Sequence, residues 1–278
     1  MPELPEVERG RRLAEAVAVG RRIARVWCAD DRIVLDSASP RRWRRALEGR
    51  RVRAARRWGK QLWLELDAPP HPLFHFGMSG ALKTPDATPI QLKSGPREDR
   101  PVWPPRYLKV RLHLDDGREL AMTDARRLGR ALLRDDPEHE PPIARLGFDP
   151  LLAMPAPARF SEMLRARRGI LKSLLLDQSF AAGVGNWIAD EVLYQAGIDP
   201  RRRASSLTDE EARRLRARLG SIVKRAVAAN ADSSRYPRTW LFHRRWGKRG
   251  NARTARGERI EHQTIGGRTA AWVPSAQR

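Results

Sequence analysis

The hydrophobic pattern of this chain changes once along its length, and the change limits the folds open to it. Up to about residue 135, apolar and polar residues alternate in short runs, which is typical of half-buried β-strands. From Phe160 onward, apolar residues recur every three or four positions, which predicts helices. An acidic and then Pro-rich stretch separates the two patterns. We therefore predict an α+β chain in three parts: a β-rich domain at 1–135, an interdomain linker at 136–158 and a helical domain at 159–278.

Individual elements follow from the same patterns. A helix is expected from Leu4 to Val19, because its apolar residues share one face and Gly20 stops it. Residues 85–105, rich in Pro and polar residues, are expected to form a surface loop. Strands are expected at 22–36, 51–67, 73–82, 110–114 and 120–123, the last two joined by a turn at 115–117. Helices are expected at 161–167, 170–176, 186–196 and 208–229.

The charge of the chain predicts a polyanionic partner. Its 278 residues carry 55 Lys and Arg against 33 Asp and Glu, a net charge of +22. Residues 201–278 alone hold 20 of the basic and 6 of the acidic residues, so the excess is concentrated near the C-terminus. Each phosphate neutralised by such a surface releases counterions, which favours nucleic acid. A ribosome- or RNA-associated basic protein fits this charge equally well, but it fits no other feature of the chain.

Two further features bear on the compartment. No stretch is long and apolar enough to span a bilayer, and no signal peptide is recognisable, so we expect no membrane association. Cys28 is the one cysteine, which excludes an internal disulfide and is compatible with a reducing cytoplasm. We therefore expect a cytoplasmic protein.

The opening Met1-Pro2-Glu3-Leu4-Pro5-Glu6 combines two reactive groups. If Met1 is removed, the ring nitrogen of Pro2 becomes a secondary amine, and α-amino groups titrate near ~7.7–8.0. Such an amine attacks an aldehyde-like carbon and gives a charged iminium, while the adjacent carboxyl group of Glu3 is placed to move protons. By itself the stretch also fits the start of a helix, where Pro and Glu are both favoured.

A second candidate site is the Gly-rich connection Gly183-Val184-Gly185-Asn186. It directs backbone N–H groups and the Asn186 amide outward at the N-terminus of a predicted helix that Asn186 caps, which suits an anion. A tight connection between two helices explains the same residues.

Five stretches occur in an order that is informative as a set: PELPEVE at 2–8, RWGK at 57–60, HFGMSG at 75–80, DARRLG at 124–129 and LDQSFAAGVGNWIADEVLYQAGIDP at 176–200. Together they resemble the formamidopyrimidine-DNA glycosylase / endonuclease VIII family over essentially the whole chain. Leu4 is typical of the formamidopyrimidine branch, since the endonuclease VIII branch usually has Gly there.

The resemblance implies a bifunctional DNA glycosylase and abasic-site lyase of base excision repair. Its fold would be an N-terminal β-sandwich with an N-terminal helix, followed by a helical helix–two-turn–helix domain that ends in a β-hairpin finger. Damaged double-stranded DNA would be the partner, with the lesion flipped out of the helix. A monomer is implied, and for a bacterial protein the nucleoid would be its place of action.

The resemblance also assigns roles to ten residues. Pro2 would form a Schiff base with C1′ and start β,δ-elimination, with Glu3 and Lys60 as its catalytic partners. Lys60, His75, Asn186 and Arg268 would hold phosphates. Glu6 would lie near the lesion, and Met78, Arg126 and Leu128 would fill the space left by the extruded base.

The finger departs from the family pattern. Four zinc-binding cysteines are common there, and their positions fall on Arg253, Arg256, Val273 and Ala276 with the spacing kept. None of these side chains replaces a thiolate at a tetrahedral zinc site. We therefore predict no cofactor and a zincless finger at about 245–278. A finger that has lost its fold, with weak DNA binding, is the alternative.

Two other departures concern the substrate. Leu128 replaces the usual aromatic residue, and the stretch 232–240 is shorter than the loop that covers 8-oxoguanine in the family. Formamidopyrimidines are thus the predicted substrates, with 8-oxoguanine as a further candidate. The alternatives are a preference for oxidised pyrimidines, hydantoins or single-stranded lesions, and a non-catalytic damaged-DNA-binding protein.

Overall fold

The structure is a computed structural model that describes residues 2–86, 102–246 and 250–278. Most of the predicted surface loop at 85–105 and residues 247–249 of the predicted finger therefore lie outside the described residues. The chain divides into two compact units. The first contains Met1–Arg145 and Asn230–Asp232, and the second contains Leu146–Ala229 and Ser233–Arg278.

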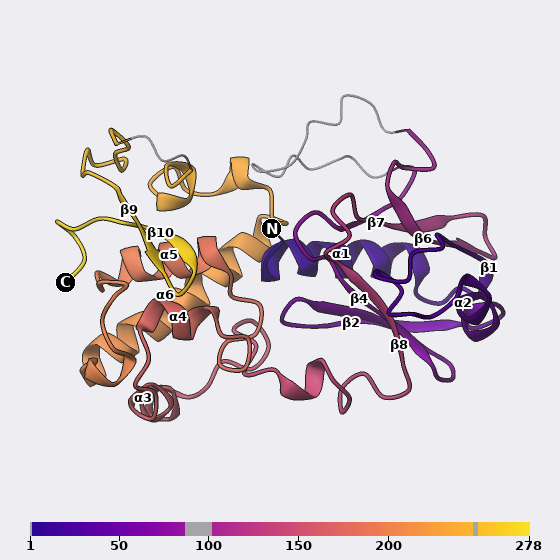
Figure 1. The fold of residues 1–278 in the computed structure, drawn as a ribbon, viewed down its shortest axis with the longest axis horizontal. Coiled ribbons are helices and arrows are strands. Elements are labelled where there is room, and N and C mark those ends of the chain that lie inside the picture. The colour runs from indigo at the N-terminus through magenta and orange to yellow at the C-terminus, as the bar shows by residue number, and fades with distance from the viewer. Residues whose placement is uncertain (1, 87–101, 247–249) are drawn as a thin grey trace. The chain divides into compact units, whose positions relative to one another are not determined.

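The first unit is a β-sandwich of two antiparallel four-stranded sheets with two helices (Figure 1). One sheet has the strand order β1-β6-β7-β5 and consists of β1 (Ile23–Cys28), β6 (Leu108–Leu114), β7 (Glu119–Thr123) and β5 (Ala81–Lys83). The other has the order β2-β3-β4-β8 and consists of β2 (Val52–Trp58), β3 (Gln61–Leu66), β4 (His71–His75) and β8 (Arg130–Arg134). The helices are α1 (Leu4–Ala18) and α2 (Pro40–Leu47), and a 3₁₀ turn spans Ile143–Arg145.

Helix α1 joins the two layers of the sandwich. It contacts β2 and β3 of one sheet and β5 and β7 of the other, and its apolar face is buried in the shared core. Gly10 makes this close packing possible, because a Cβ atom there would come within 3.0 Å of the Phe76 ring. The helix that carries the candidate nucleophile is thus anchored by the core of the unit.

The sequence prediction differs from the structure in the first unit at several places. The expected strand at 73–82 is two strands, β4 and β5, which belong to different sheets, and β8 was not predicted. The expected strand at 22–36 ends at Cys28, and the chain then turns before α2, which was not predicted. Four arginines hide the apolar spacing of that helix, in which only Trp43 and Leu47 are buried. The expected strand at 51–67 is two strands, because Gly59 takes a positive φ and turns the chain.

The second unit contains the predicted helices, with shifted ends. They are α3 (Pro157–Arg165), α4 (Leu171–Leu176), α5 (Asn186–Ala196) and α6 (Asp209–Ala228), with 3₁₀ turns at Ala204–Ser206, Ser233–Arg235 and Leu241–His243. Helix α3 begins four residues before the predicted start, since Pro157 suits the first turn of a helix. Thr208 and Glu211 cap α6 reciprocally. No helix in the described part of the chain is both long and apolar enough to cross a bilayer.

A hairpin of β9 (Glu261–Ile265) and β10 (Arg268–Trp272) ends the second unit and packs on α5 (Figure 1). Its two-residue turn, Gly266-Gly267, has φ values of +57° and +73°, as a type I′ turn requires. Beneath the hairpin lies a small apolar cluster formed by Leu241, Ile260, Ala271 and Val273.

Candidate active site

The predicted nucleophile lies at the N-terminus of α1. Glu3 is the N-cap residue of this helix, and it is almost fully buried. Its side chain accepts the backbone N–H of Glu6, while the Glu6 carboxylate accepts the N–H of Glu3 at 2.9 Å. This capping box fixes the backbone directly after Pro2 and holds two carboxyl groups within one helical turn.

The two carboxyl groups influence each other. Burial and the neighbouring charge of Glu3 raise the pKa of Glu6 to about 7. Near neutral pH, Glu6 is therefore present in both its protonated and its ionised form. One carboxyl group at this site is thus able to donate a proton, which is the chemistry needed where a base leaves and sugar bonds break.

A basic group occupies one end of the β2-β3-β4-β8 sheet. His75 ends β4 and is paired across the strands with Gln61 on one side and Arg130 on the other. Lys60 directly precedes Gln61, so it lies at the same end of the sheet. The arrangement places two cationic side chains beside one imidazole, which suits a phosphate group.

The protonation state of His75 follows from its surroundings. Burial, Lys60 and Arg130 lower the pKa of His75 to about 4, so the ring is neutral at physiological pH. Its Nδ1 atom accepts the N–H of Gly77 at 3.3 Å. The ring proton therefore lies on Nε2, which makes His75 a neutral hydrogen-bond donor to an anion.

The three predicted void-filling residues lie on two adjacent loops. Met78 follows β4, while Arg126 and Leu128 lie between β7 and β8. All three side chains are exposed, Met78 by 37% and Leu128 by 46%. Exposed apolar side chains beside a cation are what a wedge into stacked bases requires.

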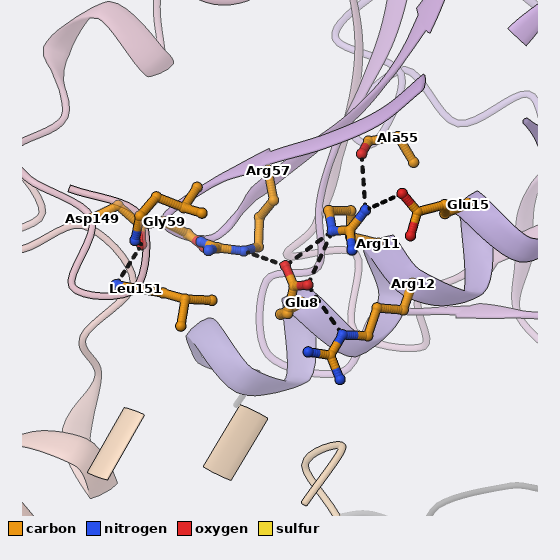
Figure 2. Close-up of polar contacts among 10 residues, drawn as sticks. Glu8, Arg11, Arg12, Glu15, Ala55, Arg57, Gly59, Asp149 and Leu151 are labelled. Carbon is orange, nitrogen blue, oxygen red and sulfur yellow. Dashed lines mark hydrogen bonds and ion pairs between the residues drawn. The ribbon is translucent and has the colours of Figure 1, made fainter. Parts of the chain in front are cut away.

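A buried ion pair connects α1 with the turn that carries Lys60. Glu8 lies on the face of α1 toward β2 and accepts a hydrogen bond from Arg57 Nε at 3.0 Å. Arg57 Nη1 in turn donates to the Gly59 carbonyl at 3.0 Å. Figure 2 shows Glu8 between Arg57 on one side and Arg11 and Arg12 on the other. This contact ties α1, which follows the predicted nucleophile Pro2, to the turn that carries Lys60.

The remaining two candidates, Asn186 and Arg268, lie in the second unit. The prediction that Asn186 caps α5 is wrong: Gly185 is the N-cap residue and Asn186 is the first residue of the helix. The Asn186 side chain donates instead to the Thr269 carbonyl at 2.8 Å, beside the exposed Arg268. The structure thus brings this pair together through β10.

Asp190 is the second attachment of β10 to α5. Its Oδ2 atom accepts the backbone N–H of Ala271 at 3.1 Å and two hydrogen bonds from Arg245, at 3.0 and 2.6 Å. Its Oδ1 atom pairs with the fully buried Lys172. Asn186 and Asp190 are one helical turn apart and bind alternate residues of the strand, which sets the register of the finger.

The four positions at which the family commonly holds zinc do not form a metal site. Val273 is fully buried in the apolar cluster beneath the hairpin, and Ala276 packs against that cluster. The guanidinium group of Arg253 donates to the Gly257 carbonyl, and Arg256 is exposed. No side chain of this set is a zinc ligand. Among the described residues, no group of three or more His, Cys, Asp or Glu is placed to hold a metal ion.

Comparison with known proteins establishes the family. Family models match residues 1–131, as a formamidopyrimidine-DNA glycosylase N-terminal domain, and residues 146–237, as a formamidopyrimidine-DNA glycosylase H2TH domain. The chain belongs to the formamidopyrimidine-DNA glycosylase family. A family member from Arabidopsis thaliana is 44% identical over 278 residues, which cover 100% of this chain and 71% of the relative. A second family member, from Thermus thermophilus, is 33% identical, and the match covers 100% of this chain and 98% of the relative.

Solved structures of formamidopyrimidine-DNA glycosylases have the same fold. A Lactococcus lactis enzyme, solved in a complex with DNA containing N7-benzyl-Fapy-dG, superposes with a TM-score of 0.79 at 26% identity, with 100% of both chains covered. The predicted α+β fold class and family are therefore confirmed. The activity class is confirmed as well: the chain is a DNA glycosylase and abasic-site lyase of base excision repair.

Several polar residues that organise the site were missed by sequence reasoning. Asp31 binds Arg127, and Asp124 binds both void-filling loops. In the second unit, Asp190 is likewise a buried carboxylate that holds two segments together and was not predicted. A carboxylate beside a Gly- and Arg-rich loop, as in DARRLG, was the one available signal for Asp124. For Asp31 there was none, because its partner is 96 residues away.

Proposed function

We propose that the enzyme removes ring-opened, oxidised purines from damaged double-stranded DNA through the amine of Pro2, and that it needs no metal. The nitrogen forms a bond to C1′ while the bond from C1′ to the base breaks. Opening of the sugar then gives an iminium at C1′. The proton lost by the amine and one proton from the neighbouring carboxyl groups are transferred to the departing base and to O4′. Loss of a C2′ proton expels the 3′ phosphate, and a second elimination expels the 5′ phosphate. The capping box that fixes the backbone after Pro2 is the observation that carries this assignment.

The other residues divide the remaining work. Glu3 is the group closest in the chain to the amine and transfers protons for it, while Glu6 faces the lesion and its pKa of about 7 allows a proton to be donated there. Lys60 and the neutral His75 hold a phosphate beside the lesion. In the second unit, Asn186 and Arg268 hold further phosphates, and Met78, Arg126 and Leu128 fill the vacated space.

The Lactococcus lactis relative solved with a formamidopyrimidine lesion supports this substrate class. A MutM structure solved with carbocyclic 8-oxo-G in DNA keeps 8-oxoguanine as a further candidate. Leu128 is smaller than an aromatic wedge residue, so we expect weak discrimination of the opposite base. A panel of duplexes with formamidopyrimidine, 8-oxoguanine, hydantoin and oxidised pyrimidine, each opposite all four bases, tests this choice. Faster removal of oxidised pyrimidines or hydantoins than of formamidopyrimidine would contradict it.

Borohydride trapping tests the chemistry. The processed enzyme, incubated with an oligonucleotide containing an abasic site, is expected to form a covalent adduct on reduction. Blocking Pro2 by a retained Met1 should abolish the adduct, and Glu3→Gln should slow its formation. Glu15→Gln, on the exposed side of the same helix, is the matched control. An unchanged adduct with a blocked terminus, or no adduct with the processed enzyme, contradicts the proposal and favours a non-catalytic DNA-binding protein.

We further propose that the finger is zincless and that the enzyme works as a monomer on chromosomal DNA in the cytoplasm, at the bacterial nucleoid. The apolar and charged side chains at the four finger positions support the first point. The buried thiol of Cys28 and the bacterial relatives support the compartment.

A further inference from the structure

Met78, Arg126 and Leu128, the residues proposed to fill the vacated space, lie on two loops that are held in place by contacts within the first unit. Of these residues, Met78 and Leu128 have 37% and 46% of their surfaces exposed. A wedge that enters a base stack must nevertheless hold its position against the bases it separates. The structure shows three features that supply this rigidity.

The first feature is Asp124, which is fully buried between the two loops. Its Oδ1 atom accepts the hydroxyl group of Ser79 at 2.7 Å and the N–H of Arg126 at 3.2 Å. Its Oδ2 atom accepts the N–H of Gly129 at 2.7 Å. One carboxylate therefore binds the loop of Met78 and both ends of the segment that carries the other two wedge residues.

The second feature is direct contact between the two loop backbones. A Cβ atom on Gly77 would lie 2.4 Å from the Leu128 carbonyl carbon, and one on Gly129 would lie 2.7 Å from the His75 carbonyl oxygen. Such distances are excluded for real side chains, so only glycine fits at either position. The two loop backbones are therefore packed directly against each other.

The third feature is a buried anchor for Arg127, the residue between Arg126 and Leu128. Arg127 has a φ of +55°, which is unfavourable for a side chain that is not glycine. Its guanidinium group binds the Asp31 carboxylate through two hydrogen bonds, Nε to Oδ2 at 3.0 Å and Nη2 to Oδ1 at 3.1 Å. This bidentate contact stabilises the left-handed conformation from which the two neighbouring side chains project.

Asp31 is itself held firmly. Its side chain is 7% exposed, and it also accepts Lys109 Nζ at 2.7 Å and the N–H of Val34 at 3.2 Å. Burial alone raises the pKa of this carboxyl group, but the hydrogen bonds from Arg127 and Lys109 outweigh burial and hold the pKa well below its usual range. The carboxylate is therefore ionised, and the anchor is intact, at every pH at which the enzyme is expected to work.

We propose that Asp31 is a positioning residue that acts through Arg127 to aim Arg126 and Leu128 at the space left by a nucleotide extruded from duplex DNA. The inference rests on the proposed function, in which those side chains form the wedge. Asp31 touches neither DNA nor the reacting atoms in this assignment. Its effect should therefore appear only with substrates that have a base stack to open.

The experiment compares two substrates with two variants, Arg127→Gln and Asp31→Asn. The single-turnover rate of lesion excision from duplex DNA is expected to fall by about 10- to 100-fold in both variants. Misplacing a reacting or orienting group causes rate losses of this size. A single-stranded abasic oligonucleotide has no opposing base stack. The rate of borohydride trapping on it should therefore stay within twofold of the wild-type rate, which is clearly smaller than a tenfold change. Arg127→Lys, which keeps the charge but not the two-point contact, should restore part of the activity.

Asp116→Asn is the matched control, because Asp116 also pairs with two arginines of the first unit but lies on an exposed hairpin turn. It should leave both activities unchanged. Fluorescence of 2-aminopurine placed beside the lesion reports base extrusion without chemistry, and both anchor variants should reduce it. The fluorescence measurement does not depend on covalent trapping. It therefore tests the Asp31–Arg127 contact even if the proposed chemistry of Pro2 is wrong.

Two results overturn the inference. One is wild-type excision and extrusion in Arg127→Gln with duplex DNA. The other is an equal loss on duplex and single-stranded substrates, since a general defect in folding or in the nucleophile would affect both alike.

Discussion

At the scale of single residues, the site depends on ionisable groups whose state is set by their neighbours. Glu6 and His75 are shifted in opposite senses: burial and Glu3 raise the pKa of Glu6 to about 7, whereas burial and two cations lower the pKa of His75 to about 4. The site therefore offers an exchangeable proton beside the proposed nucleophile and a neutral donor at the proposed phosphate site. A protonated carboxyl group is unusual for glutamate at neutral pH, whereas the lowered pKa keeps His75 neutral to a lower pH than an ordinary histidine.

The shift of Glu6 predicts a specific pH dependence of stability. Its pKa is about 7 in the folded protein and about 4.3 in an unfolded chain, so folding takes up a proton between these values. The stabilising contribution is fully present below about pH 4.3 and is lost as pH rises to about 7. Glu6→Gln keeps the acceptor for the Glu3 N–H and removes this loss.

Thermal melts from pH 4.5 to 8 measure the difference between wild type and Glu6→Gln. We expect the variant to gain about 2 kcal/mol relative to wild type across this range, somewhat less than the full shift implies because Glu6 is partly exposed. Glu15→Gln on the same helix should show a constant difference. A Glu6→Gln curve parallel to wild type contradicts the assignment.

At the scale of elements, the site is assembled by polar contacts between segments that are distant in sequence. Glu8 joins α1 to β2, and Asp124 joins two loops. In the second unit, Asp190 joins α5 to β10. Each carboxylate is buried and accepts several hydrogen bonds, so each fixes one element against another. Removing such a carboxylate destabilises the protein, because its buried donors then lack an acceptor.

The Glu8–Arg57 pair predicts a large loss of stability on single substitution. Both side chains are buried, so Glu8→Gln, which removes the carboxylate from the fully buried Arg57, should lower the free energy of unfolding by about 3–5 kcal/mol. Arg57→Met should cost less than Glu8→Gln, because Glu8 keeps its contacts with Arg11 and Arg12, but more than a substitution of an exposed arginine. Arg56→Met is the control: Arg56 is the neighbouring residue on β2, but it pairs with Glu65 in the open, and its loss should cost about 1 kcal/mol or less. Urea unfolding monitored by tryptophan fluorescence measures both. Similar losses in the free energy of unfolding for Arg56→Met and Arg57→Met would contradict a larger contribution from the buried pair.

The finger predicts a second result at this scale. Because its zinc positions hold no metal-binding side chains, 1,10-phenanthroline should change neither DNA affinity nor the melting temperature. Asp190→Asn should weaken DNA binding, since it releases the Ala271 N–H and a buried arginine. Asp209→Asn, on the exposed start of α6, is the control. Loss of affinity with the chelator would contradict a zincless finger.

At the scale of the whole molecule, the net charge of +22 predicts strongly salt-dependent binding. The logarithm of the association constant should fall linearly with the logarithm of salt concentration, with a slope of about −0.9 per phosphate contacted. Arg268→Ala should reduce the slope by about 1 and weaken lesion and undamaged DNA alike. Fluorescence anisotropy across a salt series provides the measurement. Arg41→Ala, on the exposed side of α2, should leave the slope unchanged, and an unchanged slope in Arg268→Ala would remove that residue from the phosphate contacts.

Local sequence determined the elements that depend on contacts a few residues apart. Helix α5 begins and ends where its apolar period predicts, and α6 starts at a capping box, because both depend on neighbours within one or two turns. The ordered motifs were sufficient for the family and the activity class. The roles of the ten site residues remain predictions.

Tertiary structure alone decided which strands pair and which polar groups meet. Strand β1 pairs with β6 across more than eighty residues, and Asp31 meets Arg127 across 96. In the sequence, Asp31 is one of 33 acidic residues and Arg127 is one of 55 basic ones, so nothing local distinguishes this pair from the others. Only when the sheets close does burial exclude water from the Asp31 carboxylate and bring the Arg127 guanidinium group within its reach.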